Sequence, residues 1–339
     1  MITTAIVILN WNGEAFIKQF LPSVLAFTND YNTRIIVADN ASTDSSVELL
    51  KSHFPTVEII LLDKNYGFAG GYNRALQQVE ATYYLLLNSD VQVSNLWLDP
   101  LVNYMQHHPD VAACQPKIRS FHEPFKFEHA GAAGGFIDKF GYPFCRGRVF
   151  GDVEVDNGQY DTIIDIFWAT GACLMIRSQV FWEVGGFDED FFAHMEEIDL
   201  CWRIKGRGYG VVCVPESVVL HVGGGTLGVE SPFKTYLNFR NNLLMLYKNL
   251  PSDTLKNVMR WKYVLDHISV LKFALSGRWA NARSVLKARR DYRKMKPSFE
   301  LKRQAILKET TSVKFEEMSS KSLVFNYFVL GRKLFHQLF

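Results

Sequence analysis

The segment Leu85-Leu86-Leu87-Asn88-Ser89-Asp90-Val91 joins a short apolar run to a polar triplet. The run is too short for a buried helix, so it predicts a buried β-strand that carries the Asp90 carboxylate at its end. In an open α/β sheet, ligands gather beyond the carboxyl ends of the strands. Oxygen ligands from Asp90 and Asn88 there suit Mg²⁺ or Mn²⁺. An aspartate that only caps the following turn explains the same residues equally well.

The chain before this segment alternates between strand and helix patterns. Four β-favouring runs are separated by helically spaced apolar residues: residues 4–9, 34–38, 57–62 and 83–87. Polar residues follow the first two runs directly, with Asn10 and Asn12 after one and Asp39 after the other. Alternation at this period predicts an α/β fold with a doubly wound, mostly parallel sheet.

A glycine-rich loop between Asn65 and Asn73 precedes the third helix. Its glycines, Gly67, Gly70 and Gly71, would let backbone amides and the helix N-terminus hold a diphosphate. The spacing fits neither Gly-x-Gly-x-x-Gly nor a P-loop. Glycine-rich turns before helices are also ordinary packing devices, and this alternative is favoured for the loop taken alone.

A second acidic group follows later in the chain, where Glu196 and Glu197 fall in the first turn of a predicted helix. Acidic first turns are usually structural, because they lie beside the positive end of the helix dipole. Phe191 and Phe192 precede them and would half-bury a carboxylate, which raises its pKa toward values useful for a general base. His221 ends an apolar run; such a histidine is commonly a core residue, but beside a metal site it would be a third ligand.

The composition is that of a globular, enzyme-sized protein. The 339 residues are 48% hydrophobic and 21% charged, which argues against disorder. Five widely spaced cysteines without a Cys-x-x-Cys pair indicate neither a disulfide framework nor a zinc site. No leader pattern precedes the first strand and no uncharged apolar run reaches about 18 residues, so we expect a cytoplasmic chain without a membrane span.

The C-terminal part differs in charge. Residues 1–230 hold 15 Lys and Arg against 28 Asp and Glu, whereas residues 231–339 hold 22 against 7. Apolar residues recur there at helical spacing, at Trp261, Val264, Leu265, Ile268, Leu271 and Leu275, and a basic segment follows. Two interpretations stay open: a helix packed on the rest of the protein with a solvated basic face, or a helix that binds an anionic membrane surface. We do not expect nucleic acid as a partner, because the N-terminal part of the chain is acidic.

Together these segments resemble family-two glycosyltransferases of the GT-A fold, in particular the rhamnosyltransferase-like branch of bacterial polysaccharide biosynthesis. The resemblance covers roughly residues 3–245 and rests on the order of seven motifs. They are Val7-Ile8-Leu9-Asn10-Trp11-Asn12, Asp39-Asn40-Ala41-Ser42-Thr43-Asp44, Asn65-x-Gly67-x-Ala69-Gly70-Gly71, Asn88-Ser89-Asp90, Thr170-Gly171-Ala172, Glu196-Glu197-x-Asp199-Leu200 and His221-x-x-Gly224.

The resemblance implies a role for each motif. Asp39 would hold the nucleobase of a nucleotide-sugar donor, and Asp90 and His221 would hold a divalent metal, Mg²⁺ or Mn²⁺. Other donor-binding residues would be Asn10, Asn12, Asn65, Gly67, Gly70, Gly71, Asn73, Asn88 and Ser89. Thr170 and Gly171 would border the acceptor, with Trp168 stacking on a sugar ring. Glu197 would be the base, with Glu196 and Asp199 as alternatives.

The resemblance also implies the domain organisation. Residues 1–116 would form the nucleotide-sugar-binding half, 117–245 the acceptor-binding and catalytic half, and 246–339 a basic, mainly helical extension. The expected reaction is inverting transfer of a sugar, from dTDP-rhamnose or a UDP-sugar, to a glycan or lipid-linked saccharide at the inner face of the plasma membrane.

Two departures from the family pattern leave an alternative open. Asn88 stands in the first position of an Asp-x-Asp motif, and Glu197 stands where an Asp is usual. An inactive relative that binds carbohydrate or acts as a scaffolding subunit would show the same substitutions. A dinucleotide-dependent dehydrogenase is disfavoured, because Asn10-Trp11-Asn12-Gly13 replaces the glycine-rich fingerprint after the first strand.

Overall fold

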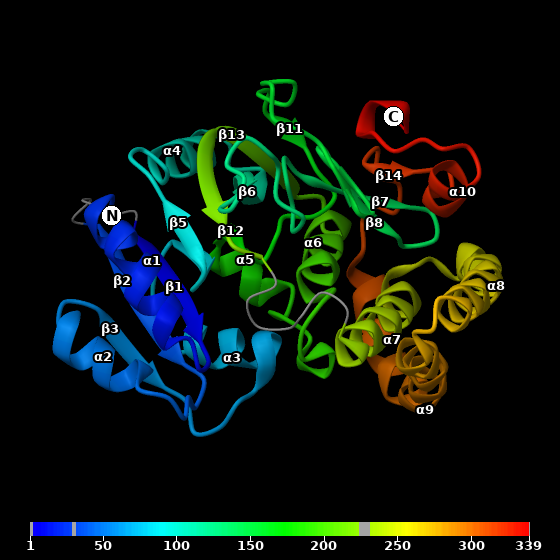
Figure 1. Ribbon diagram of the computed structural model, residues 1–339, viewed down its shortest axis with the longest axis horizontal. Helices are drawn as coiled ribbons and strands as arrows, with labels where there is room; N and C mark the ends of the chain where they lie inside the picture. The colour runs from blue at the N-terminus through cyan, green and yellow to red at the C-terminus, as the bar shows by residue number, and fades with distance from the viewer. Residues whose placement is uncertain (1–2, 29–31, 224–230, 339) are drawn as a thin grey trace.

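The computed structural model describes residues 3–28, 32–223 and 231–338 (Figure 1). Within these residues a nine-stranded sheet forms the centre of the molecule. Its path runs β11 (Ile164–Asp165), β13 (Gly210–His221), β6 (Val111–Ser120), β12 (Cys173–Arg177), β4 (Tyr83–Asn88), β1 (Thr4–Asn10), β2 (Thr33–Asp39) and β3 (Glu58–Leu61), with β5 (Val91–Val93) paired to β13.

The sheet consists of two parallel blocks. Strands β3, β2, β1 and β4 are mutually parallel, as are β6 and β13, and β12 runs antiparallel between β4 and β6. The mostly parallel, doubly wound sheet is therefore confirmed. The apolar run before Asp90 forms strand β4 as predicted, with Leu85, Leu86 and Leu87 fully buried in its centre.

Helices cover both faces of the sheet, as Figure 1 shows. They are α1 (Glu14–Ala26), α2 (Ser46–His53), α3 (Gly67–Leu76), α4 (Asp99–His107), α5 (Ser178–Glu183) and α6 (Glu196–Gly206). Alternate residues of β1 enter two different apolar clusters: Ala5 and Val7 join one, and Ile6 and Ile8 the other. A strand buried on both faces explains why this part of the sequence is a continuous apolar run.

The region 117–165, which has no clear periodicity, contributes to a smaller five-stranded sheet. Its order is β10 (Asp152–Val153), β9 (Arg148–Val149), β8 (Pro143–Cys145), β7 (Gly135–Asp138) and β14 (Met318–Ser319). β14 comes from the C-terminal part of the chain and pairs in parallel with β7. These strands are too short for alternation to be visible in the sequence.

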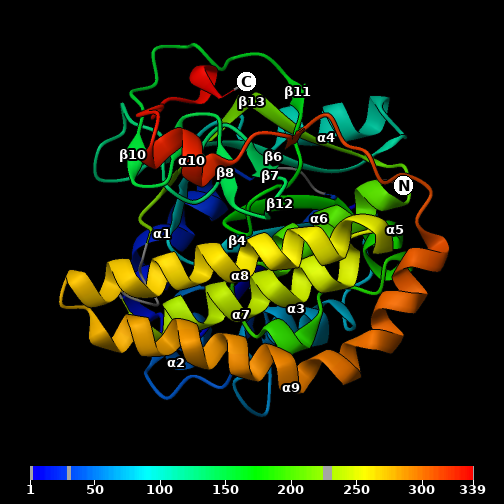
Figure 2. The same ribbon diagram turned by 90° about the vertical axis from the view of Figure 1, so that its right-hand side faces the viewer.

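The C-terminal part is mainly helical, with α7 (Pro232–Asn249), α8 (Ser252–Leu275), α9 (Trp279–Glu309) and α10 (Leu323–Phe328); two short 3₁₀ helices are η1 (Glu189–Phe191) and η2 (Phe335–Gln337). Helices α7, α8 and α9 lie side by side in Figure 2. None of the helices in the described ranges is both long and apolar enough to cross a membrane.

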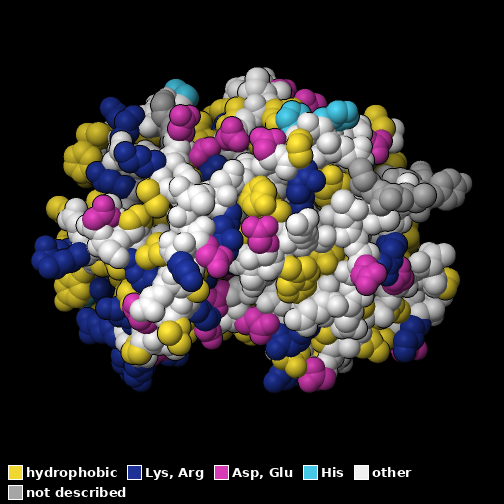
Figure 3. Space-filling view, turned by 180° about the vertical axis from the view of Figure 1, so that it is seen from behind, with side chains coloured by type: hydrophobic (Ala, Val, Ile, Leu, Met, Phe, Trp, Pro, Cys, Tyr) yellow, Lys and Arg dark blue, Asp and Glu magenta, His cyan; other side chains and the backbone are white. Residues whose placement is uncertain are grey.

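The apolar stripe predicted on α8 is largely exposed. Ile268 is 53% exposed, Leu271 59% and Leu275 80%. At its start the stripe packs on the rest of the protein, because the Trp261 ring centroid lies 6.3 Å from that of Phe140 and Leu265 packs against the larger apolar cluster. Its later residues are exposed, so both interpretations given above stay open. Figure 3 shows Lys and Arg side chains gathered with apolar ones along the edge formed by these helices.

Candidate active site

The carboxyl ends of β1 and β2 form a hydrogen-bonded group around Asp39. Asn10 Nδ2 donates to Asp39 Oδ1 at 3.0 Å, and the Ser42 backbone amide donates to Asp39 Oδ2 at 2.9 Å. Asn12 Oδ1 accepts from the Thr43 amide at 2.7 Å. Both oxygens of Asp39 thus have partners, and the side chain is held in one position with 3% of its residue surface exposed.

The glycine-rich loop packs rather than presenting open amides. Asn65 Oδ1 accepts from the Gly67 amide at 2.8 Å, and the Phe68 and Ala69 amides donate to the Phe192 carbonyl at 2.7 and 3.2 Å. A Cβ on Gly67 would lie 2.6 Å from that carbonyl oxygen, and Gly67 has φ +70°. The first amides of α3 are thus already hydrogen-bonded, and their expected availability for a diphosphate is wrong in this conformation.

The other residues of α3 have similar packing roles. A Cβ on Gly71 would lie 2.9 Å from Leu9, and one on Gly70 would lie 3.0 Å from Tyr66 Cβ. Asn73 is buried, with Nδ2 donating to the Phe187 carbonyl at 2.9 Å and Oδ1 accepting from the Phe187 amide at 3.0 Å. Asn73 therefore anchors α3 to the segment before α6, and its predicted contact with the donor would have to be indirect.

Asp90, His221 and Asn88 come together at the end of β4, as the sequence predicted. His221 Nε2 lies 3.1 Å from Asp90 Oδ1 and 3.4 Å from Asn88 Nδ2. A second carboxylate, Glu128, lies 3.1 Å from His221 Nδ1. Burial opposes a charge on this ring, but hydrogen bonds with Asp90 and Glu128 outweigh burial and raise the pKa of His221 to about 10. Gly224, the last residue of that motif, is outside the described residues.

These residues fit a divalent metal only in combination with further ligands. Among the described residues, no group of three or more His, Cys, Asp or Glu side chains is arranged to bind a metal unaided. Glu128 on Nδ1 would fix the tautomer that leaves Nε2 and Asp90 facing the same point, as second carboxylates do at metal-bound histidines. Mg²⁺ and Mn²⁺ commonly take one or two protein carboxylates and complete their shell with phosphate oxygens and water.

Glu196 and Glu197 begin α6, and neither carboxylate is fully hydrogen-bonded. Each has a buried Oε2 atom without a partner in the described structure. Burial raises the pKa of Glu197 to about 7, and burial and the Glu197 charge raise the pKa of Glu196 well above its usual value. Glu196 is 4% exposed, whereas Glu197 is partly exposed. Glu197 is therefore the less buried residue of the pair.

Asp199, the third candidate base, is wrong for that role. It is fully buried and accepts from Arg203 Nε at 3.0 Å, Lys248 Nζ at 2.8 Å and Asn249 Nδ2 at 2.8 Å. With both of its oxygens already accepting such bonds, it has no access to an acceptor hydroxyl. Asp199 ties α6 to α7.

The loop before α6 is strained and is held by α7. Phe192, His194 and Met195 have φ values of 65°, 69° and 72°, a region that non-glycine residues seldom adopt. Asn241 Nδ2 donates to the carbonyls of Phe191, Ala193 and His194 at 2.8–2.9 Å. Such strain persists only where surrounding contacts over-determine it, and it concentrates at functional sites.

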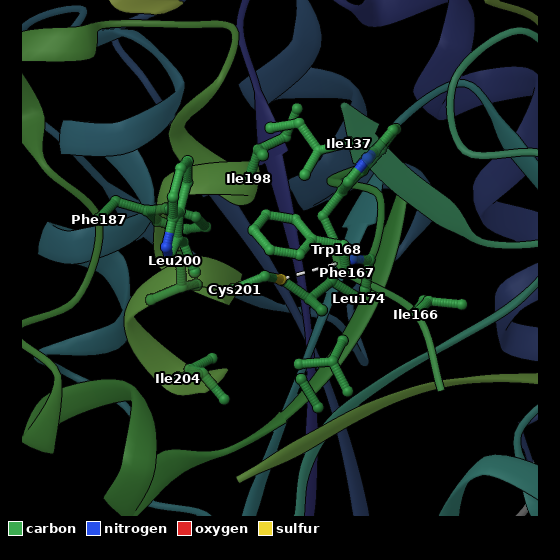
Figure 4. Packing of buried hydrophobic residues seen from close by; sticks show 14 of the residues in the cluster. Ile137, Ile166, Phe167, Trp168, Leu174, Phe187, Ile198, Leu200, Cys201 and Ile204 are labelled. Atoms are coloured by element: carbon green, nitrogen blue, oxygen red, sulfur yellow. Dashed lines mark hydrogen bonds between the residues drawn. The ribbon is translucent and has the colours of Figure 1, made fainter. Parts of the chain in front are cut away.

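Thr170 and Gly171 lie in a buried turn before β12, where the Thr170 amide donates to Gln115 Oε1 at 2.9 Å. The predicted stacking of Trp168 on a sugar is wrong: its residue is 3% exposed, and Nε1 donates to the Phe136 carbonyl at 2.9 Å. Figure 4 shows Trp168 and Phe167 within the apolar cluster that faces Ile198 and Cys201 of α6. The ring packs over Gly135, which leaves room for it because glycine has no side chain.

Sequence reasoning missed two residues of this site. Glu128 lies in the region without periodicity, where no pattern marks it. Lys234 lies in the first turn of α7, and burial lowers its pKa while the Glu128 carboxylate opposes this. Burial, and then the charge of Lys234, lowers the pKa of His194 to about 4. Lys234 thus interacts electrostatically with both Glu128 and His194 of the loop before α6. A lone lysine in the first turn of a helix gave no signal in the sequence.

A sheet of this order, with carboxylates at its carboxyl edge and an unpaired glutamate at the start of a neighbouring helix, defines a glycosyltransferase of the GT-A type. Residues 5–185 match the family described as Glycosyl transferase family 2, which is more than half of the chain. The chain belongs to that family and is a glycosyltransferase.

Relatives and solved structures agree with this assignment. The chain is 26% identical over 231 residues to an N-acetylglucosaminyl-diphospho-decaprenol L-rhamnosyltransferase of Mycobacterium tuberculosis, covering 64% of this chain and 75% of that one. It is 26% identical over 225 residues to Rhamnosyltransferase WbbL of Escherichia coli, covering 64% and 82%. Its fold is similar to that of mannosyltransferase PcManGT from Pyrobaculum calidifontis in complex with GDP-Man and Mn²⁺, with a TM-score of 0.52, 14% identity and coverage of 90% and 86%.

Proposed function

We propose that this glycosyltransferase transfers a sugar with inversion from a nucleoside-diphosphate sugar, dTDP-rhamnose or a UDP-sugar, to a lipid-linked glycan in surface polysaccharide synthesis. The observation that carries the proposal is Glu197, a partly buried residue whose carboxylate has an unpaired oxygen and a pKa of about 7. A group with this pKa is half ionised near neutral pH and can both take up and release a proton. The rhamnosyltransferase relatives support the choice of donor.

The donor would bind across the carboxyl ends of β1, β2 and β4. Asn10 and Asp39 are paired in register on neighbouring strands, as are Leu9 and Asn88. Asp39 would accept from the base edge of the nucleotide, and Asn12 and Ser89 would border the ribose and diphosphate. The glycines of α3 would shape this pocket by close packing.

Asp90 and His221 would hold a divalent metal, with Asn88 as a weaker ligand and Glu128 orienting the histidine. The metal would supply charge stabilisation for the nucleoside diphosphate as it leaves. Lys234 provides a further cation on the same side, near Glu128. We assign it to the diphosphate, because Tyr72 is buried where many family members place an arginine.

In the reaction, Glu197 accepts the proton of the acceptor hydroxyl while that oxygen attacks the anomeric carbon from the face opposite the leaving diphosphate. The bond to the diphosphate breaks as the new glycosidic bond forms, which inverts the configuration without a covalent enzyme intermediate. Glu196 is buried beside Glu197, and burial and the Glu197 charge raise the pKa of Glu196, so Glu196 keeps its proton and Glu197 is the member of the pair that can lose one.

Donor preference is tested first by thermal shift, with dTDP-rhamnose and a panel of UDP- and GDP-sugars in Mn²⁺, Mg²⁺ or EDTA. Turnover on a lipid-linked acceptor is then measured with the best donor. We expect stabilisation and turnover with one donor class only in the presence of metal. Equal stabilisation by all nucleotide-sugars, or turnover that EDTA leaves intact, would contradict the donor and metal assignments.

Peripheral attachment to an anionic membrane, at the cytoplasmic face, is the second part of the proposal. The exposed stripe on α8 lies beside exposed Phe328 and Val329 near α10, and Lys272 Nζ lies 4.1 Å from the Phe328 ring centroid. Lys and Arg near an anionic surface contribute about 1 kcal/mol each. The triple variant Ile268→Ser, Leu271→Ser and Leu275→Ser should lose co-sedimentation with anionic vesicles, whereas the control pair Leu286→Ser and Leu301→Ser on α9 should keep it.

A further inference from the structure

A pocket of about 560 Å³ lies between the N-terminal half of α8 and the middle of α9, on the side of the protein formed by the C-terminal helices (Figure 2). The last turns of α7 contribute Tyr247 to its wall. Five cationic side chains line it: Lys256, Arg260, Arg289, Lys296 and Arg303. Among the residues that the structure describes, no acidic one lines it. None of these five residues takes part in the site described above.

The acidic partners of these cations are few. Arg289 Nη1 donates to Asp266 at 2.5 Å, but Asp266 is shared with the buried Lys262. Glu300 accepts from the Tyr247 hydroxyl. Within the described part of the chain, Lys256, Arg260 and Lys296 have no carboxylate within ion-pair distance. The Glu300 charge acts on Arg303 and Lys296, so five cations stand against two nearby carboxylates, one of them shared, and the pocket keeps a net positive charge.

The two buried arginines show how the pocket is built. Arg303 is 5% exposed and is fixed by bonds to the Tyr247 carbonyl and, at 3.1 Å, to Ser252 Oγ. Arg289 is 8% exposed, and its Nε atom lacks an acceptor among the described residues. Burying a guanidinium with an unused donor is unfavourable unless something else offsets it.

Hydroxyl groups add to the donors. Tyr263 and Tyr292 also line the pocket, and burial raises the pKa of Tyr292 to about 12, so its hydroxyl stays protonated at neutral pH. Guanidinium forks, ammonium groups and hydroxyls are the donors with which proteins bind phosphate, and a dianion matches several converging cations better than a carboxylate does.

We propose that this pocket binds a phosphate or diphosphate group, carried either by a lipid headgroup or by a soluble phosphate compound. Its position supports a phosphate on an amphiphile, because the exposed stripe residue Val264 lies one helical turn after Arg260 on the same face of α8. A headgroup in the pocket would place its acyl chains beside that stripe. The site is independent of the catalytic proposal, since none of its lining residues is assigned to the donor or the metal.

The test uses two charge-matched variants of the full chain. The pocket variant carries Lys256→Gln, Arg260→Gln and Lys296→Gln, all exposed residues whose replacement should leave the fold intact. The control variant carries Arg283→Gln, Lys287→Gln and Lys294→Gln, exposed residues that helical geometry places on the opposite face of α9. Both variants lose three positive charges, so a general loss of electrostatic attraction affects them equally.

Binding of inorganic pyrophosphate is measured by calorimetry in EDTA at constant ionic strength. We expect the wild type and the control variant to bind with similar affinity and the pocket variant to bind about tenfold more weakly or worse, given the strength of charge-assisted bonds. Pyrophosphate that binds at the catalytic site does so in all three proteins and cancels in the comparison. Equal affinity in the two variants, or no binding by the wild type, would overturn the proposal.

Vesicles distinguish the two sources of phosphate. Co-sedimentation is measured with phosphatidylcholine vesicles that contain or lack phosphatidic acid. If the pocket variant loses more co-sedimentation with the phosphatidic acid vesicles than the control variant does, the phosphate belongs to a lipid headgroup. If both variants lose co-sedimentation equally and the pyrophosphate result holds, the phosphate belongs to a soluble compound. Sugar transfer by the wild type is assayed separately, so its failure counts against the proposed function alone.

Discussion

Asp39 and Glu197 are both acidic side chains at the ends of elements that border the site, but their surroundings are opposite. Asp39 receives a hydrogen bond on each oxygen. Glu197 keeps a buried oxygen without a donor, and burial raises its pKa to about 7. A carboxylate that is fully bonded in the free protein is suited to hold a ligand in a fixed position. One that lacks donors is suited to exchange a proton, because both of its states are accessible.

The largest effect that would sharpen this comparison is expected at Asp90. Asp90→Ala should bring turnover below detection and remove the metal-dependent stabilisation by the nucleotide-sugar, because the proposed metal site would lose the carboxylate beside His221 Nε2. The unfolding temperature without ligand should change little, since the residue ends a strand. Full activity of the Asp90→Ala variant in EDTA would show that Asp90 does not act through a metal.

Glu197→Gln should lower kcat by about 10²- to 10⁴-fold, the usual contribution of a general base, and leave the KM for the donor nearly unchanged. The proton is transferred only in the transition state, so ground-state binding does not depend on it. Glu196→Gln is the control and should have a smaller effect. The reverse order would exchange the roles of the two glutamates.

Asn241 tests whether the strained loop positions Glu197. Asn241→Ala leaves three carbonyls before α6 without their donor and should lower kcat more than it raises KM, with a stability loss of about 1–3 kcal/mol. Asn238→Ala, one turn earlier on α7, removes only a bond to the Lys234 carbonyl and serves as the control. If both variants behave alike, α7 supports the fold and does not position the base.

The smallest effect concerns pH. The folded-state pKa of Glu197, about 7, lies above its usual value of 4.5, so the folded protein binds this proton more tightly than the unfolded chain. The contribution of Glu197 to the free energy of unfolding is therefore fully present below about pH 4.5 and is lost as the pH rises through 7. Glu197→Gln should be more stable than wild type by about 1–3 kcal/mol at pH 8 but not at pH 4.5. Turnover of the wild type should rise over the same interval.

Much of the fold could be predicted from the sequence because its strands are buried on both faces and its helices carry regular apolar spacing. The strand ends place Asn10, Asp39 and Asp90 at one edge by geometry alone. The burial of Trp168 could not be predicted, because it depends on Gly135, a residue 33 positions earlier in a region without periodicity. From the sequence, Asp199 is an alternative base to Glu197, and only the partners that α7 supplies, Lys248 and Asn249, exclude it. For α8 the spacing predicted the helix but not which way its stripe faces.

The antiparallel strand β12 has a consequence for synthesis of the chain. It covers one edge of β4, yet β4 ends at Asn88 and β12 begins at Cys173. At about 5–20 residues per second, several seconds pass on the ribosome before its partner emerges. During that time the Leu85–Leu87 edge is open to pairing with another nascent chain, as unprotected edge strands are. Yield in the cell should therefore respond to translation speed between these strands.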